Sequence, residues 1–236
     1  TVPSHRPLVE LAAPHARLVI CQKPFAETLA DGAAMVAACD AAGATLMVHE
    51  NFRWQRPYRA LKEAMAGIGE PRFLRLSFRH AYDVYAGQPY LAEVADLALT
   101  DVGLHLFDLT RYLMGDATDI HCRTQRLNPL VQGQDAFLAS IGLSSGAVAS
   151  VECSFFTHLD PDPFPQTLAQ VEGSEGSVEL LEGYRLRRHG PNGRVEEAVE
   201  PAVPGWGGKP WHLVQESVQA FEAHADTPAV LEEERG

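Results

Sequence analysis

Cysteine is scarce and unpaired in this sequence. The four cysteines, Cys21, Cys39, Cys122 and Cys153, lie far apart, and none belongs to a CxxC pair. This spacing excludes zinc-finger and thioredoxin-type motifs. Three of the four stand in apolar runs, where a free cysteine usually behaves as a small buried hydrophobic residue. Free thiols fit a reducing compartment, so the sequence predicts a cytoplasmic protein.

Long apolar runs and an excess of basic charge are also missing. No run approaches the roughly 18 apolar residues of a membrane-spanning helix, and we expect no signal peptide, because the first residues lack a charged segment followed by an apolar block. The formal net charge of −12 argues against nucleic-acid and anionic membrane partners. The 236 residues, 46% of them hydrophobic, are enough for one large or two small globular domains.

The glycine-rich turn of a nucleotide-binding fold is missing too, although residues 1–53 otherwise match such a fold. Two apolar strands, at residues 17–21 and 45–50, flank an alanine-rich helix that begins after Thr28 and ends at Gly43. Short apolar strands separated by helices indicate a Rossmann-type parallel sheet buried on both faces. Because no GxGxxG motif is present, we expect at least one further βαβ unit to precede these residues, in a longer protein.

Residues 54–236 have a different pattern. From about Pro71 onward, stretches alternate polar and apolar residues, and turn sequences such as Ser145-Gly146 join them. This alternation predicts an α+β domain with a large, mostly antiparallel open sheet that is covered on one face. The same domain contains predicted helices at residues 100–116 and 211–225.

The uncovered face of such a sheet needs a protein surface to cover it. Its strands carry apolar residues such as Leu143, Val151 and Phe155, which we expect on this face. The sequence therefore predicts a homo-oligomer, a dimer or tetramer, that assembles through the open sheet.

Two groups of residues are candidates for chemistry. Lys23 follows a strand and precedes Pro24, whose ring restricts the residue before it. The lysine is therefore aimed off the carboxyl end of the strand, where α/β sheets bind ligands. Asp101 and His105 are four residues apart and share one face of the predicted helix, where a carboxylate can orient an imidazole that acts as a general base.

Each feature has a simpler explanation when it stands alone. A lysine before proline is usually an exposed loop residue, and an Asp/His pair on a helix is usually a solvated surface pair. Asp108, three residues past His105, could cap the helix or pair with Arg111. A metal site formed by Asp101, His105 and Asp108 would need a second cluster with ligand spacing, and we see none, so we predict no metal.

The order of the motifs nevertheless resembles one family. Pro3-Ser4, CQKP at residues 21–24, VHENFRWQRP at 48–57 and DVGLHLFDLTRYLMGD at 101–116 precede the long sheet. In this order the sequence resembles the Gfo/Idh/MocA family of NAD(P)-dependent oxidoreductases. The last motif carries the most weight, because it begins 78 residues after Lys23 (101 − 23).

The resemblance implies roles for three residues. In the family, the lysine that matches Lys23 lies between the nicotinamide and the substrate hydroxyl. His105 matches the imidazole that takes the hydroxyl proton while hydride leaves the same carbon for C4 of the nicotinamide. Lys23 would stabilise the developing alkoxide, and Asp101 would help to hold the substrate. The peptide bond at the matching proline is often cis, so we predict a cis bond between Lys23 and Pro24.

The resemblance also implies a cofactor, NAD or NADP. The residues that would contact it are Pro3, Ser4, Gln22, Lys23 and Pro24. Gln22 departs from the glutamate of the family, which removes a charge near the nicotinamide ribose but keeps a hydrogen-bonding amide. The residue that selects between NAD and NADP is not found in this sequence.

The segment between the first strand of the sheet and the helix of Asp101 is rich in aromatic and polar residues. Such residues suit a polyhydroxylated ring, although a surface loop with structural tyrosines is the alternative. The residues expected to contact the substrate are Lys23, Arg53, Tyr82, Tyr85, Gln88, Asp101, His105 and His158. The whole pattern is most similar to the sugar dehydrogenases of the family, so we predict oxidation of a hydroxyl of a sugar or polyol, for example of an aldose to its lactone.

Two other functions stay open. An NAD-dependent glycosidase of the same family would oxidise its substrate transiently and consume no net cofactor. A sugar- or nucleotide-sensing regulator would keep the fold without the chemistry. The presence of Lys23, Asp101 and His105 together argues against a regulator, because a sensor needs no base.

Overall fold

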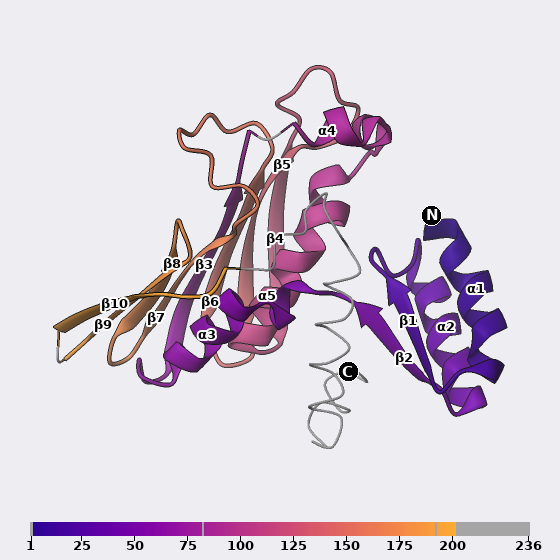
Figure 1. The fold of residues 1–236 in the computed structure, drawn as a ribbon, viewed down its shortest axis with the longest axis horizontal. Coiled ribbons are helices and arrows are strands. Elements are labelled where there is room, and N and C mark those ends of the chain that lie inside the picture. Colours follow the sequence, from indigo (N-terminus) through magenta and orange to yellow (C-terminus); the bar gives the residue numbers. More distant parts are fainter. Residues whose placement is uncertain (1, 82, 192, 202–236) are drawn as a thin grey trace. The chain divides into compact units, whose positions relative to one another are not determined.

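The structure is a computed structural model that describes residues 2–81, 83–191 and 193–201. The helix predicted at residues 211–225 lies outside this part of the chain. The described residues divide into two compact units, a smaller one with residues 2–51 and a larger one with residues 52–201. Figure 1 labels the α-helices and the strands of both units.

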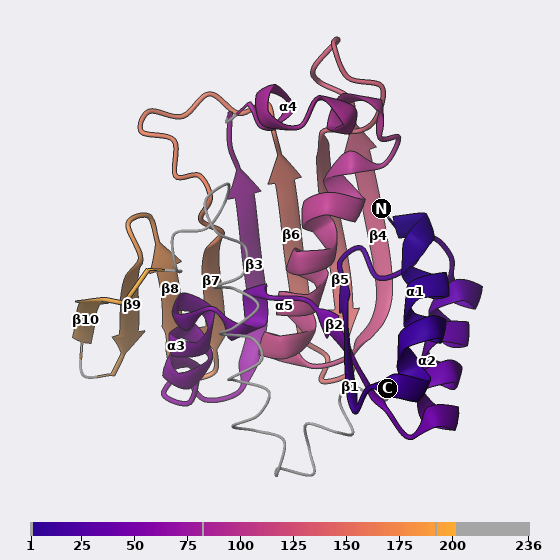
Figure 2. The same ribbon diagram turned by 45° about the vertical axis from the view of Figure 1, so that its right-hand side comes forward.

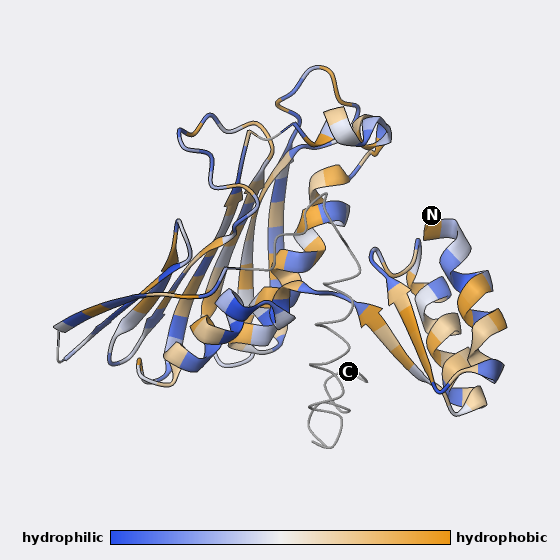
Figure 3. Cartoon of the chain, in the orientation of Figure 1, coloured by the Kyte–Doolittle hydropathy of each residue, from blue (hydrophilic) through white to orange (hydrophobic). Residues whose placement is uncertain are grey.

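The smaller unit is an α/β fragment built on two parallel strands. Its elements, in chain order, are η1 (Val2–Ser4), α1 (His5–Ala12), η2 (Ala13–His15), β1 (Leu18–Gln22), α2 (Leu29–Ala42) and β2 (Thr45–His49). The two strands run in parallel, from Leu18 opposite Thr45 to Gln22 opposite His49. Figure 3 shows them mostly in hydrophobic colours. The predicted parallel sheet of a Rossmann-type fold is thereby confirmed.

The helix α2 begins and ends where the sequence predicts. Thr28 Oγ1 accepts a hydrogen bond from the backbone N–H of Asp31 at 3.1 Å, which satisfies one of the free donors of the first turn. Gly43 ends the helix with φ at 68°, a conformation that favours glycine. Both α1 and α2 lie on one face of the strands (Figures 1 and 2). The sequence predicts burial of these strands on both faces. Ile20 is exposed on the other face, so within the described residues the helices cover only one face.

The larger unit contains a sheet of eight strands in the order β10-β9-β8-β7-β3-β6-β5-β4 (Figure 2). The strands are β3 (Pro71–Arg79), β4 (Ala117–Gln125), β5 (Ala136–Leu143), β6 (Val148–Ser154), β7 (Leu168–Gly173), β8 (Ser177–Leu181), β9 (Arg185–Gly190) and β10 (Gly193–Ala198). Only β3 and β6 pair in parallel among these neighbours. The predicted large, mostly antiparallel sheet is confirmed.

Six helical segments accompany the described strands of this sheet. They are η3 (Phe52–Trp54), α3 (Arg56–Met65), α4 (Val84–Gly87), η4 (Pro89–Glu93), the π-helix η5 (Ala98–Gly103) and α5 (Leu104–Met114). The two longest, α3 and α5, lie against one face of the sheet (Figure 2). No helix among the described residues combines the length and the apolar character needed to cross a bilayer.

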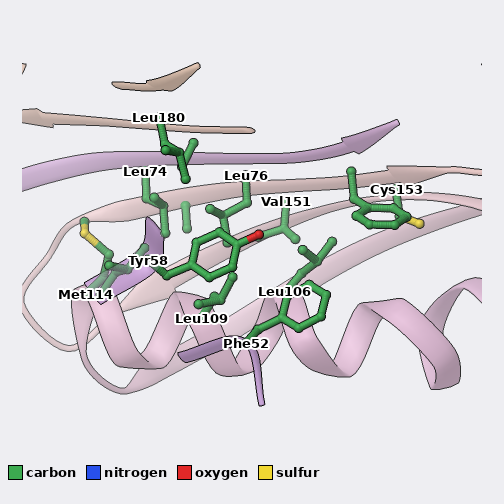
Figure 4. Packing of buried hydrophobic residues seen from close by; sticks show 14 of the residues in the cluster. Phe52, Tyr58, Leu74, Leu76, Leu106, Leu109, Met114, Val151, Cys153 and Leu180 are labelled. Atoms are coloured by element: carbon green, nitrogen blue, oxygen red, sulfur yellow. The ribbon is translucent and has the colours of Figure 1, made fainter. Parts of the chain in front are cut away.

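The core of the larger unit fills the space between the sheet and these helices. Leu106 and Leu109 of α5 face Leu76 and Val151 of the strands, and all four are fully buried (Figure 4). Alternation along the strands explains this, because every second side chain of β3 and β6 points to the helix side. The apolar face of α5 is thus held against the middle of the sheet.

The residues predicted to lie on the open face of the sheet lie on the other face, so this prediction was wrong. Leu143, Val151 and Phe155 are buried in the core, on the side that the helices cover. The exposed apolar side chains of the opposite face include Phe73 and Leu138. Strand alternation defines two faces, but the sequence alone does not say which of them receives the helices.

Candidate active site

Lys23 stands directly after the carboxyl end of β1, in the smaller unit. Its side chain is half-buried, and its backbone N–H donates a hydrogen bond to Gln22 Oε1 at 2.8 Å. The glutamine side chain is therefore folded over the turn. The peptide bond between Lys23 and Pro24 is cis, which confirms that prediction.

This turn is tied to the start of α1. His5 Nδ1 donates to the carbonyl oxygen of Phe25 at 3.1 Å, and the thiol of Cys21 donates to the same oxygen at 3.8 Å. Because His5 follows the end of η1, these bonds bring η1 close to the turn after β1. The residues predicted to contact the cofactor therefore lie close together: Pro3, Ser4, Gln22, Lys23 and Pro24.

Asp101 and His105 lie in the larger unit, where the structure differs from the single α-helix that the sequence predicts. Asp101 belongs to the π-helix η5, and His105 lies in the first turn of α5. The backbone N–H of Leu104 donates to the carbonyl of Leu99, five residues earlier, which widens this turn. Such π-helical turns inside helices are frequent at functional sites.

Gly103 lies at the junction of the two helices in a tight space. A Cβ atom at this position would lie 3.1 Å from the carbonyl oxygen of Ala98 and 3.2 Å from the ring of Phe137. Both contacts are closer than ordinary van der Waals distances. The glycine between Asp101 and His105 thus lets the helix approach β5, the strand of Phe137.

The imidazole of His105 is buried and stacked on an aromatic ring. Its centroid lies 4.1 Å from that of Phe52, with an angle of 3° between the planes. His105 is 2% exposed and Phe52 is 1% exposed. Phe52 in turn stacks on Tyr58 at 5.8 Å. A buried ring between apolar neighbours cannot be the solvated surface residue that the isolated sequence motif would suggest.

Arg53, the next residue after Phe52, makes an ion pair with Asp108. Its Nε lies 2.9 Å from Asp108 Oδ2, and a second guanidinium nitrogen bonds Oδ1. The two side chains are mostly buried, 16% and 20% exposed. The alternative that Asp108 pairs with Arg111 was therefore wrong, because Arg111 pairs with Asp116 at 2.8 Å.

Tyr85, in α4, has a buried hydroxyl to which none of the described residues forms a hydrogen bond. Burial, together with the charges of Asp135 and Asp83, raises the pKa of Tyr85 to about 12. The phenol therefore stays protonated near neutral pH and is available as a donor. Buried polar groups almost always find a partner, so a water molecule or a ligand is the expected acceptor.

Cys153 of β6 interacts electrostatically with both Tyr85 and Asp101. Burial raises the pKa of the Cys153 thiol, and the carboxylates of Asp101 and Asp135 act in the same direction. Cys153 also contributes to the raised pKa of Tyr85. Tyr85, Asp101 and Asp135 therefore each lie within electrostatic range of Cys153.

Asp135 is a buried charged residue that the sequence did not reveal. It is fully buried, and its two carboxylate oxygens accept hydrogen bonds from the backbone N–H groups of Leu127 and Asn128 at 2.6 and 2.8 Å. These bonds shape the loop before β5. Its only signal in the sequence is an acidic residue directly before an apolar strand.

Gln88 and His158, two of the remaining predicted substrate residues, lie in loops of the larger unit. Gln88 is exposed and accepts a hydrogen bond from the hydroxyl of Tyr90 at 2.9 Å. His158 is exposed and lies edge-on to Phe156. Tyr82 lies outside the described residues. In the same part of the chain that the structure describes, no group of three or more His, Cys, Asp and Glu side chains could hold a metal ion.

The sequence matches known proteins over almost its whole length. The pattern that defines the GFO/IDH/MocA C-terminal domain matches residues 58–179. D-apiose dehydrogenase from Rhizobium rhizogenes is 45% identical over 226 residues, which are 95% of this chain and 66% of that protein. D-apiose dehydrogenase from Paraburkholderia graminis is 44% identical, over 95% of this chain and 60% of its own. The chain thus spans 60–66% of the length of these relatives.

Solved structures agree with this match. An oxidoreductase from Agrobacterium radiobacter, in complex with NAD+, L-tartaric acid and magnesium, superposes with a TM-score of 0.86 at 45% identity, over 95% of this chain and 66% of its own. An oxidoreductase from Thermotoga maritima superposes with a TM-score of 0.75 at 20% identity over the same shares, which supports the fold alone.

Proposed function

Because the chain belongs to the Gfo/Idh/MocA family, we propose that its protein is an NAD-dependent dehydrogenase that oxidises a hydroxyl of a sugar, with D-apiose as the expected substrate. One observation carries the proposal: 45% identity to a D-apiose dehydrogenase across 95% of this chain. The oxidoreductase structure that is equally similar contains NAD+, which favours NAD over NADP.

The end of β1 fits the nicotinamide end of such a cofactor. The half-buried Lys23 offers a cation, and the amide of Gln22 offers hydrogen-bonding groups beside it. With Pro3, Ser4 and Pro24 these residues would hold the nicotinamide ribose and ring. The sequence has no glycine-rich turn for the pyrophosphate, so we assign no residue of this chain to that part. Bound NAD+ supplies the hydride acceptor for the carbon that carries the substrate hydroxyl.

His105 is the general base in this proposal. A ring nitrogen of the imidazole takes the proton of the substrate hydroxyl as the carbon–oxygen bond gains double-bond character. Help of this kind is worth about 10²–10⁴-fold in rate. The burial of the ring supports this role. A site that excludes bulk water strengthens the electrostatic interactions that stabilise the transition state.

Lys23 and Asp101 support the same step. The ammonium group of Lys23 donates a hydrogen bond to the oxygen of the developing alkoxide and supplies fixed positive charge. Asp101 accepts a hydrogen bond from a second hydroxyl of the sugar and so helps to orient it. Oxidation of the hydroxyl at the anomeric carbon of an aldose would give the lactone.

The substrate contacts of the larger unit are proposed on the same basis. The buried hydroxyl of Tyr85 is a donor, which suits one hydroxyl of a sugar ring. Arg53, whose guanidinium bonds Asp108 through two nitrogens, stays a prediction as a substrate contact. Gln88, His158 and Tyr82 stay predictions as substrate contacts.

A turnover assay of the full-length protein tests this function. It compares D-apiose with a panel of other aldoses and polyols, each with NAD+ and with NADP+, and follows the absorbance of the reduced nucleotide. We expect net formation of NADH with D-apiose as the best substrate. Turnover of a glycoside without net NADH would contradict it in favour of a glycosidase.

A further inference from the structure

We propose that Phe52 is a positioning residue for His105, and that the ion pair of Arg53 and Asp108 holds Phe52 in place. The inference rests on the proposed function, in which His105 takes the substrate proton. It assigns a role to the VHENFRWQRP segment that is separate from contact with the substrate.

The χ2 torsion of a histidine, which turns the imidazole ring about the bond to Cβ, has no narrow preferred angle. Rotation about the bond between Cβ and the ring is broad, so the side chain of His105 does not fix its ring plane by itself. A general base must nevertheless present its nitrogen along one direction. The plane must therefore be set by a neighbour.

Phe52 is that neighbour. The near-parallel planes, 3° apart at 4.1 Å between centroids, leave the imidazole face to face with the phenyl ring. Tyr58 supports Phe52 from within the same core, with planes 8° apart. The imidazole can slide along this face, but it cannot rotate out of the plane without opening a gap in the core. Such gaps are costly because protein interiors are close-packed.

The segment that carries Phe52 is itself anchored on α5. Phe52 contacts His105, and the adjacent Arg53 contacts Asp108, one turn further along the helix. The guanidinium of Arg53 also lies 5.6 Å over the ring of Tyr112, the next turn on. Residues at spacings of three and four share one face of a helix. Thus η3 lies along a single stripe of α5, with the catalytic imidazole at one end.

The ion pair of Arg53 and Asp108 explains why Phe52 keeps a fixed position over the imidazole of His105. A two-point bond between guanidinium and carboxylate fixes orientation as well as distance. It is largely buried, so solvent and salt compete with it weakly. If this anchor loosens, η3 can shift along α5, and Phe52 then no longer lies over the imidazole.

The test combines NMR of the histidine ring protons with steady-state kinetics of the full-length protein. The His105 signals are assigned by their loss in His105→Asn. In the wild type they lie upfield, because the stacked phenyl ring shields them. In Phe52→Leu they move downfield, and kcat falls by about tenfold or more while KM changes little, since the base is misaligned and binding is not. Phe52→Tyr keeps the aromatic face and retains both the shift and most of kcat.

Phe78→Leu is the matched control. Phe78 is as deeply buried as Phe52, but it contacts a different histidine, His80, edge-on at 4.2 Å. Its loss removes the same number of atoms from the same core. Phe78→Leu should move the signals of His80 and leave those of His105 unchanged. The comparison therefore distinguishes a general loss of core packing from a change in the orientation of the His105 ring.

Two results would overturn the inference. One is a Phe52→Leu protein whose His105 signals do not move, and the other is a kcat that falls equally in Phe52→Leu and Phe78→Leu. If Phe52→Leu does not fold, Asp108→Asn removes the charge of the anchor without a cavity and should move the His105 signals in the same direction. A wild type without turnover would contradict the proposed function, whereas the NMR comparison would still decide whether Phe52 orients the imidazole.

Discussion

The imidazole of His80 lies against the carboxylate of Asp162, with Nδ1 2.9 Å from Oδ1. The same carboxylate accepts hydrogen bonds from the backbone N–H groups of Ala81 and Phe164. The other ring nitrogen of His80 lies 3.1 Å from the carbonyl oxygen of Gln166. This pair therefore joins the end of β3 to the long segment between β6 and β7.

The stability of the protein should depend on pH through His80. Burial lowers the pKa of His80 below its ordinary 6.5, although Asp162 opposes the shift. The folded state then binds fewer protons here than the unfolded state, so the contribution is fully present above pH 6.5 and falls as the pH drops below it. Denaturant unfolding should show this decline, and His80→Gln should reduce it. An unfolding free energy that stays constant from about pH 7.5 to about pH 5.5 would contradict the prediction.

Removal of Asp162 should destabilise the larger unit. Asp162→Ala leaves His80 and two backbone N–H groups without their acceptor, at a cost of about 2 kcal/mol or more. The control is Asp116→Ala, which breaks the pair with Arg111 at a side chain that is 73% exposed, and should cost less than about 1 kcal/mol. Chemical denaturation measures the loss in free energy of unfolding in both variants. Equal losses would show that the hydrogen bonds of Asp162 add no more stability than the exposed pair of Arg111 and Asp116.

A side chain at residue 103 should disturb the junction of η5 and α5. In Gly103→Ala the new methyl group meets the carbonyl of Ala98 and the ring of Phe137, and the resulting shift should cost about 1–3 kcal/mol and lower kcat. Gly67→Ala is the control, because its Cβ would meet only an ordinary contact at 3.6 Å. Thermal unfolding and turnover measure both effects. A Gly103→Ala protein as stable and active as Gly67→Ala would count against the account of this junction.

The open face of the sheet should carry the contacts of an oligomer. Phe73 of β3 stands beside Val148 of β6, and Leu138 lies on the adjacent β5; they are 36%, 41% and 53% exposed. We propose that these side chains are buried in a homo-oligomer. Light scattering at micromolar concentration should give a mass above that of one chain, and the double variant Leu138→Lys, Val148→Lys should lower it. The control Leu130→Lys, at an exposed leucine outside the strands, should leave the mass unchanged. A monomeric wild type would refute the proposal.

Local sequence signals predicted much of the fold. Thr28 and Gly43 mark the ends of α2, because capping depends on the residue itself and its immediate neighbours. The change from continuous apolar strands to alternating ones separated the parallel pair from the mostly antiparallel sheet. The cis bond at Pro24 was expected from family resemblance and not from composition.

Contacts between distant residues could not be predicted in this way. Arg53 and Asp108 are 55 residues apart, so no local pattern pairs them, and the nearer Arg111 was the obvious partner for Asp108. The stacking of Phe52 on His105 has the same origin in tertiary packing. The π-helical turn at Asp101 was also missed, because a spacing of four residues reads as an α-helix unless the packing around Gly103 is known.

In the proposed reaction, His105 removes the proton of the substrate hydroxyl and Lys23 stabilises the resulting oxyanion. The most direct measurement compares kcat and substrate Kd for the wild type, His105→Asn and Lys23→Met, with NAD+ and D-apiose in the full-length protein. We predict that His105→Asn loses about 10²-fold or more in kcat with nearly unchanged Kd, and that Lys23→Met also loses kcat. A His105→Asn enzyme that turns over at the wild-type rate would contradict it.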